Sequence, residues 1–262
     1  MKPSKISSVM FVFLLIALIG SACGQPATSL PTEVPTDEPP VVSTPTNTAI
    51  PTKTPRPTAT PNLAATQQME DAHTRVQSYV DAGYLENSSG KLIELDDYQG
   101  ELAQIGSLDF AFAGYDGQIK DFAVWAKLKW ENAGAIITPY HSGCGFSFRF
   151  NGDTFDGYTA MLTTERVLLT YCNSSINRCG EIGKTKGTGV LKMGNPAEAT
   201  MEMVVRDSQA FVLVDGEFIG EYTLFTDKLM DPGFLIYSII SGTNRDYGTR
   251  CEITDTNVWV VK

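Results

Sequence analysis

The chain has 262 residues and a formal charge of −10, with 20 lysines and arginines against 30 aspartates and glutamates. This excess of acid repels phosphate backbones, so nucleic acid is excluded as an expected partner. Ten of the 14 prolines lie between Pro26 and Pro61. About 200 residues follow this tract. The roughly 175 of them from residue 86 onward are enough for one globular domain with a sizeable core.

Residues 1–22 are predicted to be an export signal. Lys2 and Lys5 give a positive start, residues 6–19 are mostly apolar, and residues 20–22 have the small side chains that suit a signal peptidase. The apolar run is too short for a membrane-spanning helix, which needs about 20 residues. We therefore expect the chain to leave the cytoplasm.

Cys23 follows this signal directly. The stretch "LLIALIGSAC" resembles the lipobox of bacterial lipoproteins, with Gly20 standing where that family prefers leucine. The resemblance implies lipidation of Cys23 and a protein anchored to the bacterial cell membrane on its extracytoplasmic side, since two or more acyl chains anchor a protein durably. The alternative is a plain secretory signal that is cut after Ala22.

Residues 23–61 are predicted to be a disordered linker that begins with the lipidated cysteine. The tract is rich in proline and threonine and offers almost no apolar side chain for burial. Because proline fixes φ and removes a hydrogen-bond donor, such a tract forms a semi-rigid spacer rather than a fold.

Residues 62–85 are predicted to contain one amphipathic helix, over residues 63–82. Its apolar residues recur at spacings of three and four, namely Met69, Ala72, Val76, Tyr79 and Val80. Gly83 is expected to end the helix in the left-handed conformation. We expect the apolar stripe to dock on the domain, the alternative being pairing with a second copy. His73, at the flank of the stripe, is expected to be partly solvated.

After this helix the period of the apolar residues changes to two, which is typical of strands. The clearest strand lies within residues 121–132, with Phe122, Val124, Ala126, Leu128 and Trp130 on one face and Trp125, Lys127 and Lys129 on the other. In residues 144–153 the same alternation turns Cys144, Phe146, Phe148 and Phe150 inward and Ser147 and Arg149 outward.

Further strands are predicted at residues 158–162, 166–172, 200–206, 209–214, 217–222, 233–241 and 251–261. The Asp-Gly pair at residues 215–216 is a hairpin signal. Many short alternating strands without crossover helices indicate an all-β, antiparallel sandwich or barrel.

The domain has four cysteines, and an even number in an exported chain predicts two disulfides. Of the three possible pairings we expect Cys172–Cys179, because these residues are close enough to close a hairpin tip, and hence Cys144–Cys251. Zinc binding by the four cysteines is the competing interpretation, but the sequence has no CxxC knuckle.

The segments "CGFSFRF", "MEMVVRDSQAFVLVDGEFIGEY" and "GFLIYSIISGTNRDYGTRCEITDTNVWVV" and the linker before them are similar to bacterial lipoproteins with a C-terminal concanavalin A-like (laminin G-like) domain. The resemblance covers residues 86–262 and implies an antiparallel jelly-roll sandwich. Some laminin G-like domains bind calcium, so calcium is the one cofactor that we consider. This fold serves lectins, glucanases and adhesion modules alike, so it implies no activity by itself.

The sequence predicts no catalytic residues. His141 is the only histidine in the domain, which argues against a catalytic triad. Glycoside hydrolysis needs two carboxylates about 5 to 9 Å apart. In "IELDDYQGE", Glu94 and Asp96 have the initial spacing of the related glucanases, but Glu101 is misplaced for the third acid. Glu217 and Glu221 share a strand face but lie about 13 Å apart along it.

A lectin-like site needs aromatic rings and planar polar groups on one outward sheet face. Strand alternation suggests such a set of ligand-binding residues, namely Trp125, Lys127, Arg149, Tyr158 and Glu202. The competing interpretation is that Trp125 packs under a loop and Arg149 pairs with Glu202. We therefore expect a lipid-anchored, cell-surface binding protein for glycan, without catalysis. The alternatives are a glycoside hydrolase of the same superfamily and a protein-binding adhesive module in which the helix pairs two chains.

Overall fold

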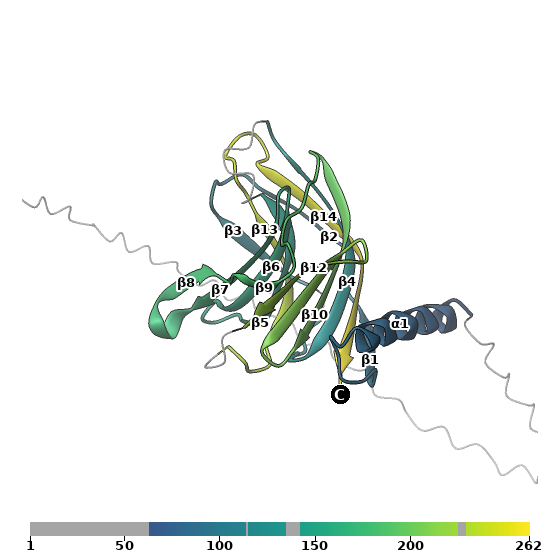
Figure 1. Cartoon of the computed structure of the whole chain (residues 1–262). Helices are drawn as coiled ribbons and strands as arrows, with labels where there is room; N and C mark the ends of the chain where they lie inside the picture. The colour runs from purple at the N-terminus through teal and green to yellow at the C-terminus, as the bar shows by residue number, and fades with distance from the viewer. Residues whose placement is uncertain (1–62, 114, 135–141, 225–228) are drawn as a thin grey trace, which may run out of the picture. The chain divides into compact units, whose positions relative to one another are not determined.

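The computed structural model describes residues 63–113, 115–134, 142–224 and 229–262. The predicted signal, Cys23, the linker and His141 lie outside the described residues. In the part described, one helix precedes two antiparallel β-sheets that face each other across a core (Figure 1). This arrangement confirms the predicted all-β, jelly-roll type of sandwich.

The elements run in chain order as follows: α1 Leu63–Asp81, β1 Gly90–Glu94, β2 Tyr98–Leu102, β3 Leu108–Phe112, β4 Phe122–Asn132, β5 Gly143–Asn151, β6 Asp156–Thr163, β7 Val167–Asn173, a 3-10 turn Ser174–Ile176, β8 Arg178–Glu181, β9 Lys184–Lys186, β10 Ala197–Arg206, β11 Gln209–Val214, β12 Glu217–Thr223, β13 Phe234–Ile240 and β14 Thr249–Val261. The eight-stranded sheet has the order β1-β14-β4-β10-β11-β12-β9, and β2 also pairs with β14. The six-stranded sheet has the order β3-β13-β5-β6-β7-β8.

The core lies between the inner faces of the two sheets. It contains the five inward residues predicted for β4, from Phe122 to Trp130, and from β5 it contains Cys144, Phe146 and Phe148. On the opposite face of β5 the Ser147 hydroxyl lies within hydrogen-bond distance of the hydroxyls of Thr159 and Ser238. Alternation therefore predicted the two faces of β4, and those of β5 as far as Phe148, correctly.

The predicted inward position of Phe150 is wrong, because β5 contains a bulge. Arg149 has a φ of 48°, and the register with β6 shifts between Phe148 and Asn151. The extra residue interrupts the alternation. Phe150 is consequently buried outside the main core, with its ring 4.8 Å from that of Phe110 and 5.9 Å from that of Phe155.

Both predicted disulfides are confirmed. Cys144 on β5 is bonded to Cys251 on β14, so this disulfide joins the two sheets. Cys172 and Cys179 are bonded across the β7–β8 hairpin, where they are direct partners in the register. With all four sulfurs in disulfides, zinc ligation by these cysteines is excluded.

Helix α1 docks on the outer face of the eight-stranded sheet. Its buried residues Ala72, Val76 and Tyr79 pack in one cluster with sheet residues that include Trp125 and Trp259. Gly83 has a φ of 77°, as expected for the left-handed end of a helix. The stripe thus docks on its own domain through Ala72, Val76 and Tyr79, while Met69 at its start stays 40% exposed. No described helix has the length and apolar character that a membrane crossing needs.

Candidate functional site

Of the five residues predicted to share a binding face, the structure places Arg149 and Tyr158 elsewhere. Tyr158 is fully buried in the core, where its ring stacks on Phe148 at 5.3 Å. Register explains the error, because Tyr158 is the direct partner of the inward Phe148 and so points to the same side. Tyr158 therefore cannot contact a ligand on the outer face of the sheet.

Arg149 is also buried, and its side chain has an exposed fraction of 0%. Its guanidinium forms an ion pair with Asp121 at 3.1 Å and donates to the carbonyl oxygens of Lys120 and Asp207. Burial lowers the pKa of Arg149, and the charge of Asp121 opposes that shift. The predicted outward position and the alternative pairing with Glu202 are both wrong, since Arg149 instead holds two loops together.

Trp125, Lys127 and Glu202 do lie on the outer face of the eight-stranded sheet, and Trp125 is the register partner of Glu202. Helix α1, rather than a loop, packs over Trp125 on this face. Trp125 is 8% exposed and lies 5.5 Å below the guanidinium of Arg75. Lys127 remains exposed in an ion pair with Asp255 at 2.8 Å.

Glu202 fixes the helix to the sheet. The Tyr79 hydroxyl donates to its carboxylate at 2.5 Å, and the Arg75 guanidinium lies 3.0 Å from the other oxygen. Burial raises the pKa of Tyr79 well above its usual range, and the neighbouring charge of Glu202 raises it further. Both oxygens of Glu202 therefore have partners on α1, which gives this carboxylate a structural role.

The same sheet face becomes accessible again beyond the end of α1, in a groove that we call the Tyr84 groove. Its volume is about 360 Å³, within the size range of small-ligand sites. It is lined by Ala82, Gly83, Tyr84, Lys186, Arg206, Gln209, Phe211, Phe218 and Glu221. The polar and aromatic side chains come mainly from β9, β10, β11 and β12, which are rigid supports.

One wall of the Tyr84 groove is a stack of aromatic rings. Tyr84, which directly follows the left-handed Gly83, lies 4.7 Å from Phe211 and 5.8 Å from Phe218, with interplanar angles of 26° and 22°. Phe211 is buried, Tyr84 is half-buried and Phe218 is 38% exposed. The stack therefore presents aromatic surface to the groove.

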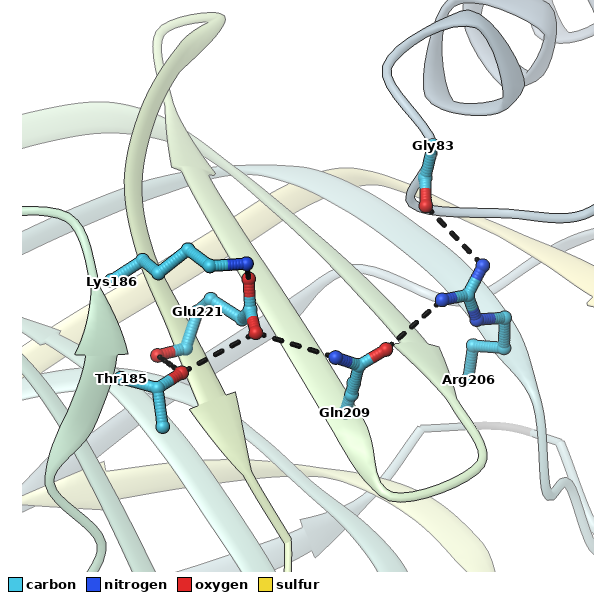
Figure 2. A network of polar contacts seen from close by, with 6 residues as sticks. All are labelled: Gly83, Thr185, Lys186, Arg206, Gln209 and Glu221. Carbon is cyan, nitrogen blue, oxygen red and sulfur yellow. Dashed lines mark hydrogen bonds and ion pairs between the residues drawn. The ribbon is translucent and has the colours of Figure 1, made fainter.

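A network of polar side chains also lines the groove, and Figure 2 shows it running from Lys186 to the turn after α1. The Lys186 ammonium lies 2.7 Å from one oxygen of Glu221, and the Gln209 amide donates to the other at 3.3 Å. Arg206 donates to the Gln209 side-chain oxygen at 2.9 Å and to the Gly83 carbonyl at 3.2 Å. Carboxylate, amide and guanidinium are thus fixed side by side.

The two partners of the ion pair in this network differ in exposure. The side chain of Glu221 is 9% exposed, whereas that of Lys186 is 70% exposed. Burial raises the pKa of Tyr84, and the charge of Glu221 adds to the effect. The Tyr84 hydroxyl therefore stays protonated at neutral pH and can donate a hydrogen bond.

Sequence reasoning singled out Glu221, but only as a possible partner of Glu217 in catalysis. The aromatic wall left a signal in "QAFVLVDGEFIG". Ala210, Val212 and Val214 face the core, so Phe211 must face outward on the same strand. A large apolar residue on the polar face of a strand indicates that something packs there.

A second, larger cavity lies at the opposite sheet, and we call it the Phe112 cleft. Its volume is about 570 Å³, and its lining includes Phe112, Phe234, Asp153, Asp156 and Asp231. Phe112 is 69% exposed. The Asp156 carboxylate accepts hydrogen bonds from both the backbone amide and the hydroxyl of Ser174. Among the described contacts, the carboxylates of the other two acids, Asp153 and Asp231, accept no such hydrogen bonds.

The other acids considered in the sequence are on the surface. Glu94 ends β1 and contacts Gln68 of α1, while Glu101 on β2 forms an ion pair with Arg250 at 2.7 Å. Asp96 is exposed in the turn between these strands. Within the described ranges, no three or more His, Cys, Asp or Glu side chains are arranged to hold a metal ion.

No family model and no curated protein matches this chain. A carbohydrate-binding module from Bacillus subtilis is similar with 9% identity and a TM-score of 0.45, over 63% of this chain and 94% of that one. A fructosyltransferase from A. japonicus is similar with 14% identity and a TM-score of 0.43, over 70% of this chain and 28% of that one. Sheep galectin-11 is similar with 9% identity and a TM-score of 0.36, over 59% of this chain and 98% of that one. At such low identity the likeness is one of sandwich architecture alone.

Proposed function

We propose that this protein binds glycans without cleaving them and that the Tyr84 groove is its binding site. The observation that carries the proposal is the juxtaposition of an aromatic stack with a network of planar polar groups on one sheet face. Sugars present C–H faces that pack on aromatic rings and hydroxyls that pair with carboxylates and amides. The groove offers both at one place.

The chemistry of the groove favours binding over hydrolysis. Glycosidases use two carboxylates, about 5 to 9 Å apart, on either side of the scissile bond. Among the described residues that line the Tyr84 groove, Glu221 is the only acid. Both of its oxygens already have partners in the network, which holds the carboxylate as a fixed acceptor.

A glycan array with the chain from residue 23 onward, carrying Cys23→Ser, tests the binding. Phe218→Ala removes exposed ring surface and Glu221→Gln removes the central acceptor, so each should weaken binding to a positive glycan at least tenfold, or about 1.4 kcal/mol. Ile176→Ala is the matched control, because Ile176 is 59% exposed but lines neither the Tyr84 groove nor the Phe112 cleft. Unchanged binding by both groove variants would refute this site.

We propose further that lipidated Cys23 holds the domain at the extracytoplasmic side of the bacterial membrane, on the proline-rich linker. This proposal is supported by the apolar leader, the small residues before Cys23 and the composition of the linker. Mass spectrometry of the mature amino terminus should find acyl groups on Cys23. Cys23→Ser should release the protein into the medium, and a variant that remains in the membrane fraction would contradict the anchor.

The alternative function, glycoside hydrolysis, is favoured by one observation: Asp153 and Asp231 line an aromatic cleft of ligand size. If this alternative holds, glycans that bind should be cut, with release of new reducing ends. Asp231→Asn and Asp153→Asn should then abolish the release, while Glu221→Gln should leave it intact. Absence of cleavage of bound glycans supports the binding function.

A further inference from the structure

The charge balance of the Tyr84 groove narrows the class of ligand. Two cationic side chains, Lys186 and Arg206, and one anionic side chain, Glu221, line the groove. Lys186 lies 2.7 Å from the Glu221 carboxylate and compensates it. Arg206 is therefore left as an excess positive charge, in a chain whose net charge is −10.

Arg206 differs from the other well-anchored arginines described. Arg75, Arg149, Arg166 and Arg250 all form ion pairs with carboxylates. Arg206 is half-buried, yet among the described residues it forms no ion pair, and its two hydrogen bonds go to the neutral oxygens of Gly83 and Gln209. Its guanidinium is held in place without having its charge neutralised.

The position of the guanidinium suits a planar anion. It lies 6.0 Å from the centroid of the Phe211 ring, beside the aromatic stack. Of the five N–H donors of an arginine, two are used in the contacts above, so three remain for a ligand. Guanidinium binds carboxylate in a planar, two-bonded geometry that a lysine ammonium does not reproduce.

We infer that the glycan bound in the Tyr84 groove carries a carboxylate, as a uronic acid unit does, and that Arg206 is the residue that recognises it. This inference rests on the proposed function. The sugar ring packs on the Tyr84–Phe218 surface, Gln209 and Glu221 contact its hydroxyls, and its carboxylate lies against Arg206. A neutral glycan fills the same groove but leaves the guanidinium without a counter-charge.

The test uses matched ligands and the same chain from residue 23 with Cys23→Ser. The panel consists of oligogalacturonates and oligoglucuronates, their methyl esters, which keep the skeleton and lose the charge, and sulfated and neutral oligosaccharides. In calorimetric titration a free acid should bind at least tenfold more tightly than its own ester. The difference should shrink as salt is raised.

Variants then assign the preference to Arg206. Arg206→Gln should bind acid and ester equally, and Arg206→Lys should keep only part of the preference, because it retains the charge without the planar fork. Arg178→Gln is the matched control, since Arg178 is exposed on β8 and does not line the groove. A thermal unfolding curve for each variant shows whether the fold is intact.

The outcomes separate the two proposals. If neutral glycans or esters bind as tightly as free acids and Phe218→Ala weakens them, the Tyr84 groove is a glycan site and the inference about Arg206 is overturned. A preference for sulfated over uronate ligands also overturns the inference, because the anion that is recognised would then be a sulfate and not a carboxylate. If no glycan in the panel or on the array binds, the proposed function itself fails.

Discussion

The two disulfides should stabilise the domain by very different amounts. In the chain-entropy model a cross-link stabilises by restricting the unfolded chain, and the effect grows with the length of the closed loop. The cysteines are 107 residues apart for Cys144–Cys251 and 7 apart for Cys172–Cys179. These separations give about 4.8 and about 2.4 kcal/mol at 25 °C respectively.

The comparison needs two double variants, Cys144→Ala with Cys251→Ala and Cys172→Ala with Cys179→Ala. For a domain of this size, 1 kcal/mol corresponds to about 2 to 4 °C in Tm. Loss of the inter-sheet disulfide should therefore lower Tm by about 10 to 20 °C, and loss of the hairpin disulfide by about 5 to 10 °C. Urea unfolding followed by circular dichroism gives the free energies directly.

A control separates the cross-link from packing. Cys144 and Cys251 are fully buried in the core, so alanine there also removes sulfur contacts. In the hairpin double variant, reductant breaks only the Cys144–Cys251 bond and leaves every core atom in place. This reduction should lower the free energy of unfolding more than removal of the hairpin disulfide does. An equal or smaller loss would mean that the inter-sheet disulfide does not stabilise the domain through loop entropy.

Three further predictions concern pH, glycines and the helix. Burial raises the pKa of both Tyr222 and Tyr237 to about 12, whereas the unfolded tyrosines titrate near 10. As the pH rises, the unfolded state therefore releases these protons first, so the stability should be complete below about pH 10 and should fall towards pH 12. With phenylalanine at either position, the midpoint of urea unfolding should fall less over this pH range. Gly248 has a φ of 71°, and a Cβ there would lie 1.9 Å from the Leu102 carbonyl oxygen, while a Cβ at Gly83 meets nothing within 4 Å. Gly83→Ala should therefore lower the free energy of unfolding by about 1 kcal/mol, and Gly248→Ala should lower it clearly more. Equal losses in denaturant melts would contradict the steric argument. Val76 is fully buried in α1. Val76→Ala should lower the free energy of unfolding by about 2 kcal/mol and speed amide hydrogen exchange in the helix. An unchanged exchange rate would mean that this contact does not hold the helix.

The long strands could be predicted from the sequence because their information is local. In β4, β10 and β11 the core-facing residues are all apolar and alternate without interruption, and the Asp-Gly turn after β11 is a short-range signal. The two disulfides followed from a count of four cysteines and one close spacing. These features depend only weakly on the rest of the fold.

The short strands could not be predicted in the same way, because their partners define them. β14 has 13 residues, and its edge pairs with β2 along its first half and with β1 along its second half. β9 consists of Lys184–Lys186, all of them exposed, and is a strand through its pairing with β12. Such segments have no periodicity of their own to detect.

The candidate site shows a different limit of sequence reasoning. Alternation correctly assigned Trp125 and Glu202 to the outer face of one sheet, but it does not say what covers that face. The covering element is α1, which precedes the sandwich in the chain and is fixed by the contact of Tyr79 with Glu202, 123 residues away. Because the helix occupies this part of the sheet, the groove that we propose as the binding site opens beyond the end of the helix. There the left-handed Gly83 turns the chain and brings Tyr84 over Phe211. The turn that follows the covering helix thus supplies an aromatic ring to the Tyr84 groove.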